Sequence, residues 1–254
     1  MNVRTLLRSL VLLGLALGQA EVSAGNFRLS PVQVFLGDGS GSALVTVYNE
    51  SPAPVRFQIT ASAWAQDPNG EMRLGPTTDV LFFPKLLEVP SGGQRNVRVA
   101  VSTRPKDAEL TYRIFFDELP PAPVPGEGAK VNVITKMGVP IFVTPKGGRP
   151  DVVVEGTVSA GKILVDVKNR GTSHVSLQEV LVRGFGADGT EVFSGRREGW
   201  YVLGGSNRQY EIELTPEECE AASEIAVVAA FTHPAHRERA EVTTRTARAG
   251  GSCK

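Results

Sequence analysis

A long succession of short, β-prone segments, separated by turn residues, limits the folds that this chain can adopt. From residue 27 onward, segments rich in Val, Ile, Phe, Thr and Tyr alternate with clusters of Gly, Pro, Asp and Asn. Several segments keep a period of two, as Val97, Val99 and Val101 do, which is typical of a strand with one buried and one exposed face. Seven such segments in the first half, joined by regular turns, predict an antiparallel β-sandwich.

The sequence PKGGRP at residues 145–150 interrupts this pattern. Neither a helix nor a strand tolerates two glycines between two prolines, so we expect a domain hinge at residues 146–150. The β pattern then resumes with different strand sequences. We therefore predict an all-β protein with two domains, at residues 25–145 and 151–254. A hydrophobic content of 41% is consistent with packed cores.

The first 24 residues have the three parts of a secretory signal peptide. Arg4 and Arg8 precede an apolar run at residues 10–17, and small residues follow up to Ala24. The apolar run is too short to span a bilayer. We expect cleavage after Ala24, with Ala20 as the second choice, followed by export and no membrane insertion of the mature chain. A membrane anchor that is not cleaved is the alternative.

The charged and polar residues argue against several classes of function. The chain has 27 basic and 27 acidic residues, so no net charge favours nucleic acid or an acidic membrane as the partner. Its three histidines, His174, His233 and His236, all lie in sequences typical of loops. No nucleophile elbow, HExxH motif or phosphate-binding glycine loop is present in the sequence. We therefore predict that the protein is not an enzyme and needs neither a metal nor a cofactor.

Cys219 and Cys253 are the only two cysteines, and export to an oxidising compartment favours a disulfide between them. The segments EIAVVAAFT and RAEVTTRTA can form a hairpin centred near residue 236. Both cysteines are equally far from this centre and would face each other at the open end of the hairpin. Two unrelated free thiols are the alternative. Residues 215–221 carry the capping-box and proline signals of a short helix, so we expect one helical turn there.

Four features distinguish the first half from a generic sandwich. AKVNVITKMGVPIFV, at residues 129–143, is a long β-prone segment whose exposed edge would be an aggregation hazard. Arg113 and Lys136 are cations set within apolar runs of consecutive segments, where outward-facing residues on an exposed sheet face are the simplest interpretation. The other two features are the segments VLFFPKLLEVPSGGQRNVRV at residues 80–99 and FFDELPP at residues 115–121.

In this order, after a signal peptide and before a second β domain, these segments resemble the periplasmic pilus-assembly chaperones of the chaperone–usher pathway. The resemblance covers nearly the whole mature chain. It implies two immunoglobulin-like domains set as an L, with a cleft between them that binds pilus subunits. In this family the last strand of the first domain completes an unfinished subunit sandwich, which is called donor-strand complementation. The subunit is then released at an outer-membrane usher, without a nucleotide.

The resemblance assigns the donor strand to Val131, Val133 and Thr135, with Met137 as a further candidate. Outside the archaic, Csu-like branch, these chaperones anchor the subunit's C-terminal carboxylate with an arginine in the first strand and a lysine in the last strand of the first domain. Val32 stands where that arginine would fall, so the chain is more similar to the archaic branch. The donor edge also offers a route to self-association of the free chain.

The resemblance further implies which residues form the carboxylate anchor and the link between the domains. Lys136 matches the lysine of the last strand. Arg113 is the preferred second cation, because its strand is expected to pair with the strand of Lys136, and Arg28 is the alternative. Glu118 matches an acid that bridges the two domains in the family. The arginine that normally meets this acid is replaced by Thr144, so the bridge is not carried over directly.

The sequence is also compatible with two other functions. An exported adhesin or surface structural protein would also consist of two β domains, but it would give the two cations no role. A secreted hydrolase would require His174 or His233 in a spatially assembled site. The charged pair within apolar strands favours the chaperone.

Overall fold

A computed structural model describes residues 27–37, 40–67, 69–121, 133–232 and 239–247, together with Cys253. The predicted signal peptide, Val131, His233 and His236 lie outside these residues. The only helix among the described residues, α2 (Pro216–Ala221), is six residues long. Within the same part of the chain, no helix has the length and hydropathy of a membrane span.

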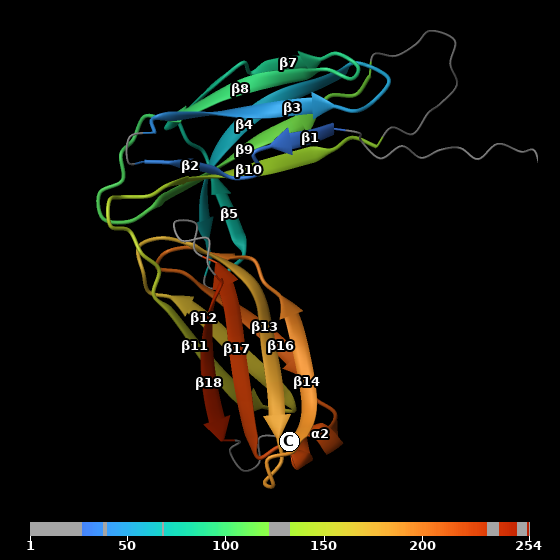
Figure 1. Ribbon diagram of the computed structural model, residues 1–254, viewed down its shortest axis with the longest axis vertical. Coiled ribbons are helices and arrows are strands. Elements are labelled where there is room, and N and C mark those ends of the chain that lie inside the picture. Colours follow the sequence, from blue (N-terminus) through green and yellow to red (C-terminus); the bar gives the residue numbers. More distant parts are fainter. Residues whose placement is uncertain are drawn as a thin grey trace, which may run out of the picture.

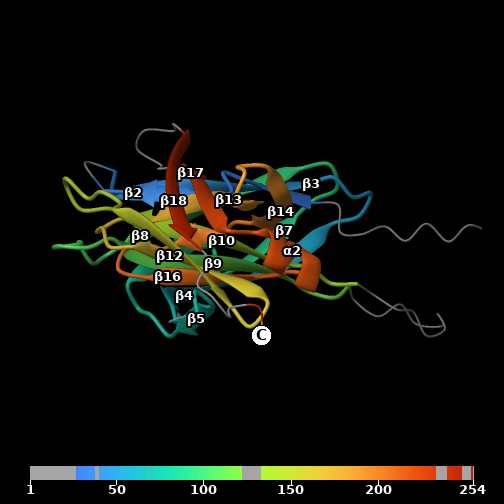
Figure 2. The ribbon, with the colours of Figure 1, turned by 90° about the horizontal axis from the view of Figure 1, so that it is seen from below.

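The chain forms two β-sandwich domains, as the strand pattern predicted (Figure 1). Strands β1–β10 build the first domain, and β11–β18 with α2 build the second. In Figure 1, β3, β8 and β10 of the first domain run across the view, β5 points down toward the second domain, and the strands of the second domain run vertically, so the domains meet as an L. The proposed hinge at residues 146–150 lies in the connection between β10 and β11. In Figure 2, seen from below, β9 and β10 of the first domain run across behind the second domain.

The first domain packs a four-stranded sheet, in the order β1-β3-β8-β6, against a six-stranded sheet. The larger sheet has the order β2-β10-β9-β4-β5, with β7 also paired to β4. Inward-facing valines, isoleucines and phenylalanines of both sheets form one core, because alternate residues of each strand point to the same side. The strands are β1 Phe27–Ser30, β2 Val34–Leu36, β3 Ser42–Asn49, β4 Val55–Gln66, β5 Met72–Gly75, β6 Val80–Phe83, β7 Leu86–Val89, β8 Gln94–Val101, β9 Leu110–Glu118 and β10 Lys136–Val143.

The second domain packs a three-stranded sheet, β11-β12-β16, against a larger sheet in the order β14-β13-β17-β18. The short strand β15 pairs with β13 beside β14. A second, separate core fills the space between these sheets. The strands are β11 Val152–Ser159, β12 Lys162–Asn169, β13 Val175–Phe185, β14 Glu191–Glu198, β15 Tyr201–Val202, β16 Asn207–Glu213, β17 Glu224–Thr232 and β18 Arg239–Ala247.

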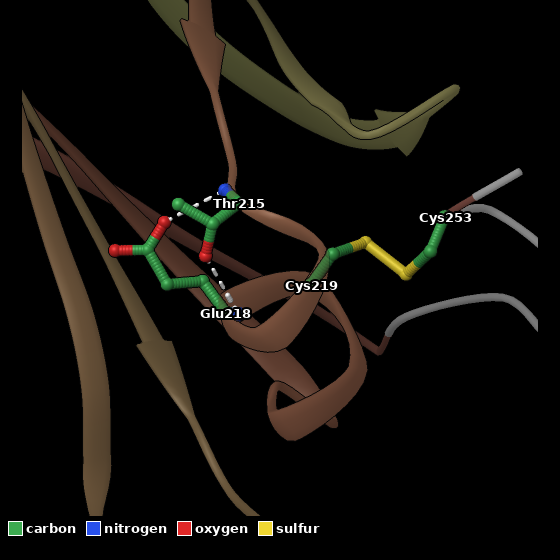
Figure 3. The surroundings of a disulfide bond; sticks show 4 residues. All are labelled: Thr215, Glu218, Cys219 and Cys253. Carbon is green, nitrogen blue, oxygen red and sulfur yellow. Dashed lines mark hydrogen bonds between the residues drawn. A yellow bond between two sulfur atoms is a disulfide. The ribbon is translucent and has the colours of Figure 1, made fainter.

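The predicted helical turn and disulfide are both confirmed. Thr215 and Glu218 form the capping box that starts α2, each side chain accepting a hydrogen bond from the other residue's backbone N–H (Figure 3). Cys219, fully buried on α2, is bonded to Cys253 beyond the end of β18. Strands β17 and β18 pair antiparallel, with Glu224 opposite Ala247, so the hairpin is centred within one residue of the predicted position.

Removing this disulfide should destabilise the second domain. The bridge closes a loop with a sequence separation of 34 residues, which restricts the unfolded chain. The chain-entropy model predicts that a Cys219→Ala, Cys253→Ala double variant loses about 3–4 kcal/mol of unfolding free energy. Urea unfolding with and without reductant measures this loss. Reductant should destabilise the parent chain but not the variant. Equal stability of the parent chain and the variant in the absence of reductant would contradict the prediction.

Candidate functional site

One side of the six-stranded sheet faces the second domain, and we call it the junction face. Tyr112, Ile114 and Phe116 of β9 point into the core of the first domain, so the alternate residues of β9 point to the opposite side. In the register of β9 with β4 and β10, the residues opposite these alternate residues point to that same side, away from the core. The junction face comprises Trp64 of β4, Thr111, Arg113, Phe115 and Asp117 of β9, and Lys136, Gly138, Pro140 and Phe142 of β10.

An aromatic cluster joins one end of the junction face to the second domain. Trp64 and Phe142 are buried against Leu203, and Trp200 and Tyr201 pack around them. The Trp64 ring lies 5.5 Å from the Trp200 ring and 5.4 Å from the Tyr201 ring, measured between centroids. These contacts remove aromatic surface of both domains from water, so they stabilise the arrangement of the domains.

Side-chain amides and a guanidinium add hydrogen bonds across the same interface. Gln66 donates to the Tyr201 backbone oxygen at 2.7 Å and accepts from the Leu203 N–H at 2.8 Å. Gln33 donates to the hydroxyl of Tyr201. Arg208 of the second domain donates to the Gly70 oxygen at 2.8 Å. Together these bonds fix β15 and β16 relative to the first domain.

A buried carboxylate, Glu109, also bridges the domains. Its Oε2 accepts hydrogen bonds from the backbone N–H of His174 at 3.0 Å and from His174 Nδ1 at 2.6 Å. Its Oε1 accepts from the Thr144 hydroxyl at 2.6 Å. Both side chains are almost fully buried, with exposures of 2% for Glu109 and 1% for His174. The His174 ring stacks on Phe142 with centroids 3.5 Å apart.

The acid that bridges the domains is therefore Glu109 and not Glu118, which the family resemblance suggested. Glu118 lies at the far end of β9, where its carboxylate accepts from the Thr135 N–H and its own N–H donates to the Thr135 oxygen, both at 3.0 Å. Thr144, at the position of the family's arginine, meets Glu109 instead. Sequence reasoning missed Glu109 and assigned His174 to a loop without a role. Their pairing depends on how the two domains dock.

Substituting Glu109 should weaken the whole chain. Glu109→Ala leaves the His174 and Thr144 donors without an acceptor at a buried interface, which should cost about 3 kcal/mol of unfolding free energy. Glu50→Ala is the matched control, because it breaks an exposed pair with Arg28 and should cost less than about 1 kcal/mol. Urea unfolding of both variants tests this, and similar stabilities for the two variants would contradict the structural role of Glu109.

Arg113 is the cation at the centre of the junction face. Its guanidinium carbon lies 4.7 Å from the Trp64 ring centroid and 5.3 Å from that of Trp200. Its Nε is buried, and among the described residues nothing accepts a hydrogen bond from it. Burial lowers the pKa of Arg113 from its usual value, with a smaller opposing effect from Tyr201. Arginine nevertheless stays charged, so this part of the chain holds a half-buried cation without a described acidic partner.

Lys136 lies on the same face but in a different electrostatic setting. Its side chain is 61% exposed, and its Nζ is 2.8 Å from Asp117 Oδ1. The register places Lys136 opposite Asp117 and Arg113 opposite Pro140. The backbone positions of the two cations are thus separated by four residues along the strands, about 13 Å. The structure brings them to one face, as the sequence pattern suggested, but does not place them in contact.

Phe115 and Gly138 occupy the space between the two cations. The Lys136 Nζ lies 4.8 Å from the Phe115 ring centroid. A Cβ added to Gly138 would be 2.8 Å from Phe115 Cε1 and 3.6 Å from Arg113 Nη1. Because Gly138 has no side chain, the Phe115 ring and the Arg113 guanidinium can lie close to its backbone. Sequence reasoning did not identify either residue, because only the strand register shows that they are neighbours.

The alternative anchor, Arg28, is not part of this face. It lies on β1, in the four-stranded sheet on the other side of the core. Its guanidinium pairs with Glu50 at 2.8 Å and lies 3.7 Å from the centroid of the Tyr48 ring. Val32 is 64% exposed in the connection between β1 and β2. Neither residue therefore lies beside Arg113.

The segment expected to act as donor strand is only partly described. β10 begins at Lys136, and Val133 before it is 62% exposed. Thr135 is half-buried, and its backbone is hydrogen-bonded to Glu118. Met137 is half-buried against the core of the first domain. Exposed apolar surface therefore lies before Lys136 and not at Met137.

The edge of β10 is paired over only part of its length. β9 pairs with all eight residues of β10, whereas β2 pairs only with Ile141, Phe142 and Val143. Among the described strands, residues 136–140 of β10 thus have no partner on the β2 side. An extended segment of another chain could add to the sheet there. No cluster of three or more metal-binding side chains occurs within the described residues.

Comparisons with known proteins agree with this architecture. Residues 26–149 match the family model described as pili and flagellar-assembly chaperone, PapD N-terminal domain. A search of curated proteins gave no match.

Several solved structures share the fold. One is the CsuC–CsuE chaperone–tip adhesion subunit pre-assembly complex from archaic chaperone–usher Csu pili of Acinetobacter baumannii, with 18% identity and a TM-score of 0.62 over 85% of this chain and 97% of the other. The YadV chaperone has 14% identity and a TM-score of 0.62 over 87% of this chain and 100% of the other. The SafB chaperone complex with SafA pilin from Salmonella enterica has 14% identity and a TM-score of 0.56 over 89% and 97%.

Proposed function

Because this chain belongs to the pilus-assembly chaperones of the chaperone–usher pathway, with a PapD N-terminal domain at residues 26–149, we propose that it binds exported pilus subunits and delivers them to an outer-membrane usher. Cleavage after Ala24 would release the mature chain into the periplasm. The observation that carries the proposal is Arg113, a half-buried cation beside the second domain with no acidic partner among the described residues. The role is one of binding and requires no catalysis.

The donor function rests on the open edge of β10. Its first half offers backbone N–H and C=O groups on the side where β2 does not reach. The exposed side chains of Val133 and Ile134 precede it. A subunit that lacks a strand would pair with this edge and bury alternate side chains of the donor segment, so main-chain hydrogen bonds and apolar contacts act together. The same edge would allow a second copy of the free chain to pair.

The anchoring function rests on the charge at Arg113. A planar guanidinium matches the geometry of a carboxylate and forms two parallel hydrogen bonds with it. The C-terminal carboxylate of a subunit that pairs with β10 would neutralise Arg113. Lys136 is the second cation of the proposed anchor. Since Asp117 already pairs with Lys136, the incoming carboxylate would have to replace or share that contact.

Loss of the Arg113 charge should reduce subunit capture. In co-expression of the tagged chain with exported subunits of a chaperone–usher pilus, Arg113→Ala should lower the recovered subunit about tenfold or more, because charge-assisted bonds would be lost. Lys136→Ala should have a smaller effect, since Lys136 is exposed and already paired. Arg28→Ala, a cation on the other sheet, is the control and should leave recovery unchanged. Full recovery with Arg113→Ala would contradict the anchor.

The donor segment can be tested with two neighbouring exposed residues. If residues 133–135 pair with a subunit as a strand, Val133 enters the subunit groove and Ile134 points away. Val133→Asp should then abolish co-purification of the subunit, because a carboxylate would be buried in an apolar groove. Ile134→Asp should retain most of it. Both variants should fold like the parent chain, since the two side chains are 62% and 56% exposed. Equal effects of the two substitutions would argue against donation by this segment.

A further inference from the structure

We propose that the second domain contributes to the anchor through Trp200, which positions the guanidinium of Arg113 for a subunit carboxylate. This inference rests on the proposed function and extends it to a site built by both domains. The Trp200 ring centroid lies 5.3 Å from the Arg113 guanidinium carbon, and the Trp64 centroid lies 4.7 Å from it on the first domain. The two indoles are 5.5 Å apart, so the three groups form one mutual contact.

The backbone around Trp200 is held firmly in the second domain. The Trp200 oxygen accepts a hydrogen bond from the Leu177 N–H at 2.9 Å, and the Gly199 N–H donates to the Gln178 oxygen at 2.8 Å. Immediately after Trp200, β15 pairs with β13. The ring of Trp200 is thus presented to Arg113 from a paired strand edge and not from a long loop.

A second arginine contacts the same indole from the second domain. The Arg208 guanidinium carbon lies 5.5 Å from the Trp200 centroid. Arg208 is already satisfied in part, because it donates to the Gly70 oxygen at 2.8 Å and lies 3.6 Å from Glu71. Of the two arginines at Trp200, only Arg113 lacks an acidic neighbour among the described residues. An anion that enters the junction should therefore bind at Arg113.

The aromatic contacts explain why an arginine is suited to this position. Arginine stacks on aromatic rings through its planar guanidinium, whereas lysine is a flexible point charge. Contact with two indoles limits the orientations of the Arg113 guanidinium before the ligand arrives. A guanidinium that is already oriented loses less conformational entropy when it binds a carboxylate, so it binds the carboxylate more tightly. Trp200 thus acts through Arg113 and need not touch the subunit itself.

The site carries its own spectroscopic probe. The chain contains two tryptophans, Trp64 and Trp200, and both lie beside Arg113. Intrinsic tryptophan fluorescence therefore reports on this site alone. The ligand is a synthetic peptide with the C-terminal sequence of a subunit that co-purifies with the chain. It is made with a free carboxylate and, as a control, with an amide end.

The central experiment is a double-mutant cycle on the peptide dissociation constant. Trp200→Ala should weaken binding of the free-acid peptide about tenfold, and Trp200→Phe, which keeps an aromatic ring, should stay within about threefold of the parent. Arg113→Lys should weaken binding although the charge is kept. The Trp200→Ala, Arg113→Ala double variant should bind no more weakly than Arg113→Ala alone, because Trp200 acts through Arg113. Fully additive losses would overturn the inference.

A matched control separates this role from simple loosening of the interface. Gln66→Ala removes two hydrogen bonds between the domains without touching Arg113. It should leave peptide binding within about twofold of the parent, and a loss as large as that of Trp200→Ala would overturn the inference. If instead Arg113→Ala itself has no effect, or if the amide peptide binds as well as the free acid, the carboxylate anchor of the proposed function fails. The two failures are therefore distinguishable.

Discussion

The antiparallel register between β9 and β10 decides which residues of the two strands face the core of the first domain and which face away from it. It sets Arg113 opposite Pro140 and Lys136 opposite Asp117, so one side of each strand enters the core and the other meets the second domain. A shift of one residue would exchange these sides and bury Arg113 in the core. Because β2 pairs only with the last three residues of β10, the same pairing leaves an open edge beside the cations.

The junction between the domains turns this sheet face into a site. Glu109, which is hydrogen-bonded to His174 and Thr144, bridges the two domains, a role that the family resemblance assigned to Glu118. The aromatic cluster around Trp64 and Phe142 excludes water from the same interface. Because a buried polar group that loses its hydrogen-bond partner costs free energy, the bonds of Glu109 favour one relative orientation of the domains. That orientation is what brings Trp200 to Arg113.

Charge is matched almost everywhere around this face except at Arg113. Lys136 has Asp117, Arg208 has Glu71, and Arg28 on the other sheet has Glu50. Holding an arginine half-buried between aromatic rings, without an acid among the described residues, lowers the stability of the free chain. A local cost of this kind is typical of functional sites, where the ligand supplies the missing partner. The exposed apolar residues before Lys136 are likewise unfavourable in the free chain, and a bound partner would cover them.

The all-β class, the two domains, the short helix and the Cys219–Cys253 bridge could all be predicted from the sequence. These follow from local signals: strand periodicity, turn residues, a capping box and the spacing of two cysteines about one hairpin. It also singled out Arg113 and Lys136, since cations within apolar runs are unusual. Three features became visible only in the folded chain: Glu109 and not Glu118 bridges the domains, Gly138 leaves space beside Phe115, and Trp200 contacts Arg113. Those contacts join residues that are far apart in the chain. Most of these residues meet only because the two domains dock, and domain docking produces no periodic pattern in the sequence.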